Sequence, residues 1–142
     1  MSNKEKLQAG LQKLGLELST TQQLLLLEYV ALLQKWNSTY NLTAVRDADA
    51  MITHHIIDSL TLLPSIKDAK TLMDVGSGGG MPGIPTAIAR PDLQITLLDS
   101  NTKKTSFLQQ AVIELGLENV TVAAGRVESM HDKKVDVVTS RA

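Results

Sequence analysis

Hydrophobic residues in the first part of the chain recur at the three- and four-residue spacing of an amphipathic helix. Leu7, Leu11 and Leu14 follow a capping-box pair formed by Ser2 and Glu5. This pattern predicts a short first helix, and the glycine at position 15 predicts its end.

Two further helices are predicted before the middle of the chain. The second begins at Ser19, where Gln22 completes another capping box. Its leucine run at positions 24–27 predicts burial on more than one side. The third runs from about residue 47 to residue 63, and Pro64 is expected to end it because proline interrupts helical hydrogen bonding.

From Thr71 onwards, short apolar runs alternate with helical stretches. Strands are predicted at residues 72–75, 94–98, 120–123 and 135–139, and helices at residues 85–89 and 103–115. Because this alternation produces right-handed strand–helix–strand units, we predict an α/β fold with a parallel sheet.

The change of pattern predicts two parts, an N-terminal helical cap over residues 1–66 and a Rossmann-like domain over residues 67–142. The last predicted strand is followed by almost no sequence. A final parallel strand normally has neighbouring elements that cover it. We therefore expect a sheet truncated after about four strands, in a fragment or shortened form of a longer protein.

The most informative stretch joins the first predicted strand to the next helix. It reads Asp74-Val75-Gly76-Ser77-Gly78-Gly79-Gly80-Met81-Pro82-Gly83. Glycines allow positive φ angles and close approach of a ligand to the backbone. In a fold of this class the ligand binds at the carboxyl ends of the strands, where this loop is expected to lie.

Two ligand classes fit the glycines of this loop. Gly78, Gly80 and Gly83 satisfy the dinucleotide fingerprint, whose loop and helix N-terminus hold a pyrophosphate. Gly76, Gly78 and Gly80, with an acid two residues earlier, resemble the first motif of S-adenosylmethionine-dependent methyltransferases. The loop alone leaves both readings open.

Asp99 ends the second predicted strand, about 20 residues beyond the loop. An acid at this place accepts hydrogen bonds from ribose hydroxyls in both NAD sites and methyl-donor sites. Asp99 therefore predicts adenosine binding without separating the two ligands. The alternative is a strand-end acid that caps residues 101–103.

The composition excludes several kinds of site and indicates where the protein is located. The chain has no cysteine, which excludes disulfides, thiolate metal sites and a cysteine nucleophile. No apolar run approaches membrane-spanning length, and no signal peptide is recognisable, so we expect a cytoplasmic protein. The net charge of −1 shows no general basic excess, so RNA contacts would depend on a local patch.

Six segments, in order and at matching spacing, carry a more specific resemblance. They are Tyr40-Asn41-Leu42-Thr43-Ala44, His55-Ile56-Ile57-Asp58-Ser59-Leu60, the loop from Asp74 to Gly83, Thr96-Leu97-Leu98-Asp99-Ser100, Gly125-Arg126-Val127-Glu128 and Val137-Val138-Thr139-Ser140-Arg141-Ala142. Together they resemble the bacterial 16S rRNA (guanine-N7) methyltransferase G family, also called the glucose-inhibited division protein B family. The resemblance covers essentially the whole chain.

This resemblance implies a Rossmann-like methyltransferase fold with S-adenosyl-L-methionine as cofactor. The implied acceptor is N7 of a guanine, position 527 of 16S rRNA in the small ribosomal subunit. Val127 and Glu128 would lie against the adenine of the donor, and Arg141 at the edge of its pocket near the acceptor. The full set of expected cofactor-binding residues is Gly76, Gly78, Met81, Asp99, Val127, Glu128 and Arg141.

The sequence departs from the family pattern at His54, where the family usually has arginine. Because histidine is largely neutral at pH 7, we expect a weaker RNA contact there. The adjacent His55 is expected to pack and to form a hydrogen bond. Neighbouring helix residues do not face one site, so the two histidines are not expected to bind a metal.

The implied reaction needs little from side-chain chemistry. Guanine N7 has an in-plane lone pair and no proton, so catalysis by proximity and orientation is expected, with no catalytic acid or base and no metal. Phosphate contacts would come from cations around the pocket mouth. The candidates are Arg46, Lys103, Lys104, Arg126 and Arg141.

Two other functions stay open on the sequence alone. One is an NAD-dependent oxidoreductase, which rests on the dinucleotide fingerprint and Asp99. The other is a non-catalytic S-adenosylmethionine-binding fragment. For the favoured methyltransferase, the expected partners are 16S rRNA and the small ribosomal subunit, with no membrane, and a monomer is expected.

Overall fold

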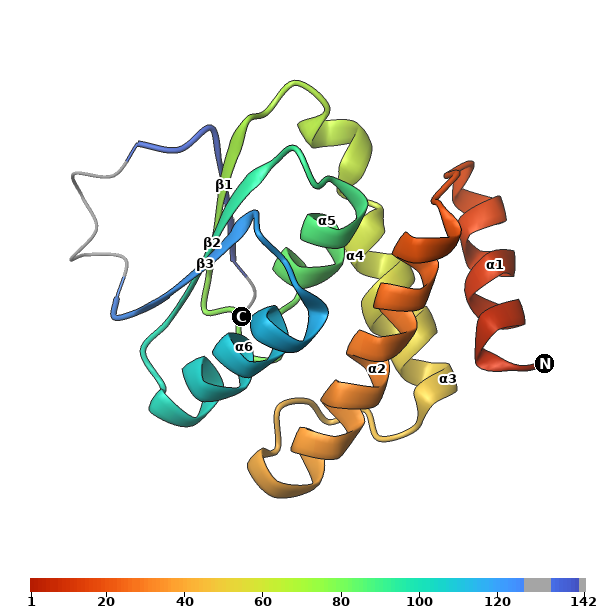
Figure 1. The fold of residues 1–142 in the computed structure, drawn as a ribbon, viewed down its shortest axis with the longest axis horizontal. Helices are drawn as coiled ribbons and strands as arrows, with labels where there is room; N and C mark the ends of the chain where they lie inside the picture. The colour runs from red at the N-terminus through yellow and green to blue at the C-terminus, as the bar shows by residue number, and fades with distance from the viewer. Residues whose placement is uncertain (127–133, 141–142) are drawn as a thin grey trace.

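The structure is a computed structural model that describes residues 1–126 and 134–140 (Figure 1). Helical elements occupy the first half of the described chain, and strands alternate with helices in the second half. In chain order the elements are α1 (Asn3–Leu14), α2 (Thr20–Tyr40), α3 (Ala48–Met51), η1 (Ile52–Ile57), α4 (Asp58–Leu60), η2 (Leu63–Ile66), β1 (Thr71–Val75), α5 (Gly83–Ala89), β2 (Gln94–Asp99), α6 (Thr102–Leu115), β3 (Val120–Ala124) and β4 (Val137–Ser140).

The four strands form one sheet in the order β3-β2-β1-β4, and all three pairings are parallel. The predicted α/β fold with a parallel sheet is therefore confirmed. The chain moves from β1 outwards to β2 and β3, whereas β4 lies on the other side of β1. This reversal creates a switch point between β1 and β4, where parallel α/β folds bind ligands at the carboxyl ends of the strands.

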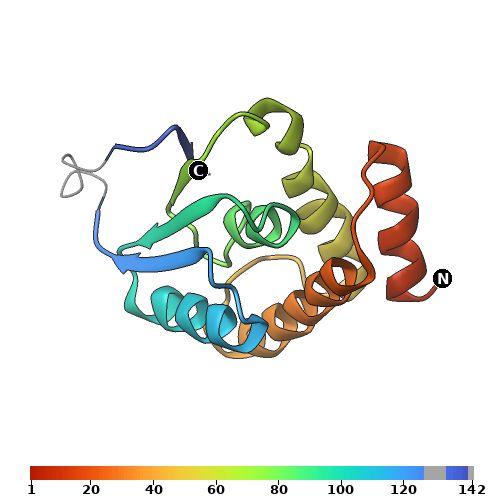
Figure 2. The ribbon, with the colours of Figure 1, turned by 45° about the horizontal axis from the view of Figure 1, so that its top comes forward.

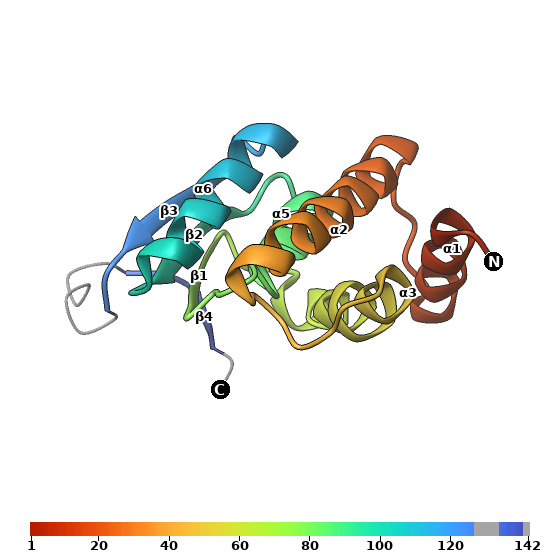
Figure 3. The same cartoon turned by 90° about the horizontal axis from the view of Figure 1, so that it is seen from below.

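The N-terminal helices pack beside the sheet as a layer of their own. Helix α2 contacts both α5 and α6, and Figures 2 and 3 show α1 at the side of the molecule far from the sheet. A single cluster of buried apolar side chains runs from Leu7 of α1 through Tyr29 of α2 to Phe107 of α6. One continuous core therefore crosses the boundary between the helical part and the sheet.

The helix termini follow the predicted capping signals. Ser2 and Glu5 form a capping box at α1, and Ser19 and Gln22 form one at α2. Gly15 ends α1 with a left-handed φ of 69°. These ends agree with the sequence because capping depends on neighbouring residues only.

The third predicted helix differs in the structure. It contains the π-helical segment η1 between α3 and α4, and it ends at Leu60 instead of residue 63. Pro64 does not end it. Pro64 lies in the first turn of the short 3-10 helix η2, where the N–H that proline lacks is not required.

Strand β4 begins at Val137, two residues later than predicted. Asp136 precedes it and accepts hydrogen bonds from the backbone N–H groups of Lys70 (2.8 Å) and Thr71 (3.2 Å). These two donors hold the pKa of Asp136 below its usual value. A side chain therefore makes the first connection between β4 and β1, and backbone pairing starts with the next residue.

Candidate functional site

The glycine loop over residues 76–80 joins β1 to α5 at the carboxyl end of the sheet. The N–H groups of Gly76 and Ser77 both donate to the Leu98 carbonyl, at 2.7 and 3.2 Å, which attaches the loop to β2. Gly76, Gly78 and Gly80 have positive φ angles of 69°, 56° and 94°. The glycines are therefore required by the backbone path of the loop.

Open space lies beside two of these glycines. A Cβ atom added to Gly76 would meet nothing within 4 Å, and one added to Gly78 would meet only the Gly76 carbonyl, at 3.8 Å. We call this space the cradle. Its glycines leave room against the loop backbone for a ligand, at the place where the fold class binds one.

Gly80 and Gly83 are glycines for a different reason. A Cβ atom at Gly80 would lie 2.6 Å from Cδ1 of Ile84. One at Gly83 would collide with Leu97 of β2 and lie 2.8 Å from Oδ2 of Asp74. Gly80 allows the loop to pack against Ile84 of α5, and Gly83 allows α5 to pack against the sheet, so neither position by itself indicates a ligand.

Asp99 lies across from the cradle at the end of β2. Its side chain is buried, and its Oδ2 accepts a hydrogen bond from the N–H of Gly78 at 2.9 Å. Its Oδ1 accepts one from the N–H of Asn101 at 2.8 Å. One oxygen of Asp99 thus binds the backbone of the glycine loop. The other binds the backbone N–H of Asn101, which agrees in part with the capping alternative. Each carboxylate oxygen retains a second acceptor position for a ligand.

The N-terminus of α5 has no N–H group left for a phosphate among its first four residues, all of them described. Gly83 donates to Asp74 Oδ2 at 3.0 Å, and Ile84 donates to the Gly80 carbonyl at 2.7 Å. Residue 85 is proline, and Thr86 donates to the Pro82 carbonyl at 3.1 Å. A dinucleotide site of this type needs such donors for its pyrophosphate. This geometry argues against the dinucleotide reading.

Comparison with known proteins decides between the remaining readings. The family model described as rRNA small subunit methyltransferase G (GidB) matches residues 22–142. The chain belongs to this family. The predicted Rossmann-like methyltransferase is supported, and neither the oxidoreductase nor the non-catalytic alternative has any support.

Individual relatives agree with the GidB assignment. A protein of Neisseria meningitidis named ribosomal RNA small subunit methyltransferase G is 66% identical over 142 residues, which are 100% of this chain and 69% of that relative. Proteins with the same name from Neisseria gonorrhoeae and Laribacter hongkongensis are 64% and 58% identical, again over 100% of this chain and 69% of each relative.

The structure brings together some of the residues that the GidB resemblance pointed to. Gly76 and Gly78 border the cradle, and Asp99 is hydrogen-bonded to Gly78. Met81 follows the loop but is only 7% exposed, and its side chain packs towards Gly79 and belongs to the core cluster. Three other expected residues lie outside the described residues: Val127, Glu128 and Arg141.

The cations expected at the pocket mouth are mostly exposed. Arg46 donates from Nη2 to Asn41 Oδ1 at 3.0 Å, in the loop that follows α2. Lys103 and Lys104 lie in the first turn of α6, the helix that follows Asp99. Arg126 is exposed just after β3.

The two histidines of the GidB segment behave differently. His55 is half-buried, and its Nε2 lies 2.7 Å from Thr43 Oγ1, which confirms the expected packed and hydrogen-bonded residue. His54, at the usual arginine position, is exposed. Within the described ranges, no group of three or more potential metal-ligating side chains gathers.

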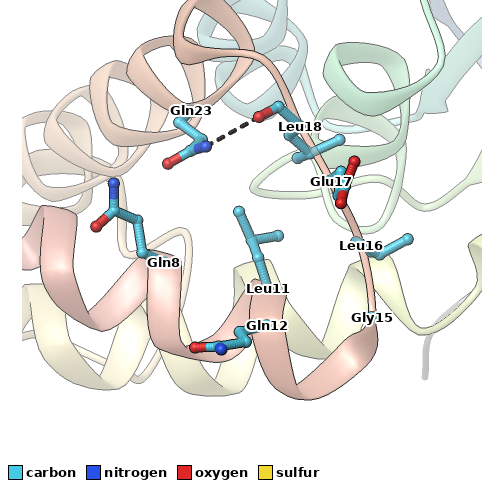
Figure 4. Close-up of a pocket in the computed structure, with 8 residues that line it drawn as sticks. All are labelled: Gln8, Leu11, Gln12, Gly15, Leu16, Glu17, Leu18 and Gln23. Atoms are coloured by element: carbon cyan, nitrogen blue, oxygen red, sulfur yellow. Dashed lines mark hydrogen bonds between the residues drawn. The ribbon is translucent and has the colours of Figure 1, made fainter.

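A surface groove of about 580 Å³ lies elsewhere, in the elbow between α1 and α2 (Figure 4). Of the described residues that line it, only Glu17 is charged. Gln23 on its rim donates to the Leu18 carbonyl at 2.9 Å, so it supports the turn. The groove contains no residue of the glycine loop.

Among the described residues, no helix is long and apolar enough to cross a membrane.

Sequence reasoning missed one residue of the site, Tyr29. Its hydroxyl donates to the Gly79 carbonyl at 2.5 Å, across 50 residues of sequence. The available signal was a hydroxyl group in the most apolar part of α2, since a buried tyrosine hydroxyl needs a partner. Sequence alone does not say which partner it meets.

Proposed function

We propose that this chain binds S-adenosyl-L-methionine in the cradle and methylates N7 of a guanine in 16S rRNA, at position 527, within the small ribosomal subunit. One observation carries the proposal. The space beside Gly76 and Gly78 opens next to a carboxylate, Asp99, while the N–H groups of α5 are already engaged. This arrangement suits an adenosine with a phosphate-free tail.

The described residues have distinct tasks in this proposal. Gly76 and Gly78 leave room for the donor against the backbone, and Asp99 accepts hydrogen bonds from its ribose hydroxyls. Met81 packs against the loop at Gly79. On the family resemblance, Val127 and Glu128 would complete the adenine side. The last expected residue, Arg141, would lie near the acceptor.

The proposed reaction requires the protein mainly to align the methyl donor with guanine N7. When bound, S-adenosylmethionine supplies a methyl group on a positively charged sulfur. Transfer to the guanine N7 lone pair would form a C–N bond as the C–S bond breaks, with the electron pair of that bond kept by sulfur. No proton leaves N7, so no general base is required. The loop and Asp99 therefore act by holding the donor in line.

The substrate RNA would meet the cations near the site. Arg46, Lys103, Lys104 and Arg126 supply this charge on the described surface, and Arg141 is proposed to join them. With a net charge of −1, the whole chain has no general attraction for RNA, so affinity depends on this local group. On the family resemblance, His54 replaces an arginine, and we expect it to contribute less to RNA binding.

Calorimetric titration of the chain with S-adenosylhomocysteine tests the donor site, with NADH as the parallel ligand. We expect binding of S-adenosylhomocysteine alone, because the cradle adjoins a ribose acceptor and α5 offers no N–H group to a pyrophosphate. Binding of NADH alone would overturn the proposal. Transfer of labelled methyl groups to isolated small ribosomal subunits, compared with protein-free 16S rRNA, then tests the acceptor.

A pair of glycine variants separates the cradle from the packing of α5. Gly83→Ala is expected to lower the free energy of unfolding by about 2 kcal/mol, because its Cβ meets Leu97 and Asp74. Gly76→Ala is expected to cost only about 1 kcal/mol for its positive φ. It should nevertheless weaken S-adenosylhomocysteine binding about tenfold, because its Cβ enters the cradle.

Chemical denaturation and calorimetry on both glycine variants measure the two effects. Gly15→Ala is the matched control. Its φ is also left-handed and its Cβ would meet nothing within 4 Å, but it lies at the end of α1. Equal loss of affinity in Gly15→Ala and Gly76→Ala would argue against the cradle.

A further inference from the structure

Tyr29 is a polar group in the apolar interface between α2 and the glycine loop. Its side chain is 0% exposed, and its hydroxyl donates to the Gly79 carbonyl. The hydrogen bond therefore joins the helical part of the chain to the loop that proposed donor binding requires. Removing either partner would leave a buried polar group without this bond.

The acceptor belongs to a peptide group that is held at both ends. Gly79 provides the carbonyl of the Gly79–Gly80 peptide, and Gly80 provides its N–H, which donates to the Ser77 carbonyl at 2.7 Å. Two hydrogen bonds in opposite directions fix the orientation of this peptide plane. On the preceding residue, the Gly78 N–H is held by Asp99 at 2.9 Å. Tyr29 and Asp99 thus hold the loop from two different elements.

Packing from the helical part covers the same segment. A Cβ atom added to Gly79 would lie 3.2 Å from Cδ1 of Leu33 and 3.7 Å from Cβ of Leu42. Gly76, three residues earlier, faces open space. The loop is therefore covered from the side of α2 at Gly79 and open at Gly76. It is held by contacts from α2 as well as from the sheet.

We propose that Tyr29 is a positioning residue for the methyl donor, because its hydroxyl fixes the Gly79–Gly80 peptide and thereby the shape of the cradle. This inference rests on the proposed function. Consecutive glycines have many accessible conformations, and a loop that is ordered before binding loses less entropy when the ligand enters. Tyr29 acts through the loop and does not touch the reacting atoms.

Tyr29→Phe removes the hydroxyl and keeps the ring. We expect the backbone amides of residues 76–81 to exchange hydrogen faster in the ligand-free protein, because the peptide loses one of its two anchors. We expect the dissociation constant for S-adenosylhomocysteine to rise roughly three- to tenfold, the effect of one hydrogen bond. In turnover on small ribosomal subunits, KM for the donor should rise while kcat is retained.

Val30→Ala is the matched control, since it also removes buried atoms from α2, one residue away. It should destabilise the fold without faster loop exchange and without weaker binding. If Tyr29→Phe leaves loop exchange and affinity at wild-type values, or if Val30→Ala changes both equally, the positioning role is wrong. If the wild-type chain itself fails to bind S-adenosylhomocysteine, the proposed donor site fails, whereas the ligand-free exchange result still tests the anchor.

Discussion

Replacement of Asp99 by alanine is expected to weaken S-adenosylhomocysteine binding by about 100-fold. On the proposed function, the variant would lose a charged acceptor for the ribose hydroxyls of the donor. It also releases the N–H groups of Gly78 and Asn101, which the carboxylate holds at 2.9 and 2.8 Å. Hydrogen bonds to a charged partner are stronger than neutral ones, so the two losses combine into a large effect. Calorimetric titration measures it.

Two further variants make the Asp99 result specific. Asp99→Asn keeps the shape of the side chain but turns one acceptor into a donor, which then faces a backbone N–H of Gly78 or Asn101. It should therefore lose most of the affinity as well. Asp92→Ala removes an acid at the opposite, amino end of β2 and should bind like the wild type. Wild-type affinity of Asp99→Ala would contradict both the ribose contact and the loop anchor.

Replacement of Asp74 by alanine is expected to lower the free energy of unfolding by about 3 kcal/mol. Asp74 is 1% exposed in the central strand β1. Its Oδ2 accepts the N–H of Gly83 at 3.0 Å, and its Oδ1 accepts the hydroxyl of Thr139 at 3.1 Å. The carboxylate therefore joins β1 to α5 and to β4. Alanine leaves both donors without this acceptor. Urea unfolding followed by circular dichroism measures the loss.

Asp74→Asn provides the internal comparison. Its carbonyl can accept from Gly83, and its amide group can donate to the Thr139 hydroxyl, which accepts as well as donates. We expect a loss of only about 1 kcal/mol for this variant. If Asp74→Ala unfolds at the same urea concentration as the wild type, these two bonds do not hold the central strand.

Local signals in this chain predicted local structure well. The capping boxes at Ser2 and Ser19 lie where the sequence places them, because each needs only a residue three positions away. After Thr71, apolar runs alternate with helical stretches. This short-range pattern predicted the parallel sheet, because strand–helix–strand units form one. Prediction was wrong for the third helix, which contains the π-helical segment Ile52–Ile57 and ends at Leu60, before Pro64.

The candidate site likewise contains residues that the sequence predicted and one that it did not predict. The proximity of Gly76, Gly78 and Asp99 was predicted, because glycines after one strand and an acid at the end of the next lie at the same edge of a parallel sheet. Tyr29 was not predicted, since its partner lies 50 residues away in sequence. The donor-binding roles of all seven expected residues stay predictions, and three of them, Val127, Glu128 and Arg141, lie outside the residues that the structure describes.

The sequence by itself determined the fold class, the ends of the first helices and the family, since each is encoded by residue type at short spacing. Only the tertiary structure decided what each glycine and acid of the loop does. Asp74 and Gly83 have the residue types of a ligand site, yet the Asp74 carboxylate accepts the Gly83 N–H, the first of α5. Gly76 faces open space, whereas Gly79 is covered by α2. Such assignments depend on contacts between distant segments, which residue type and spacing do not specify.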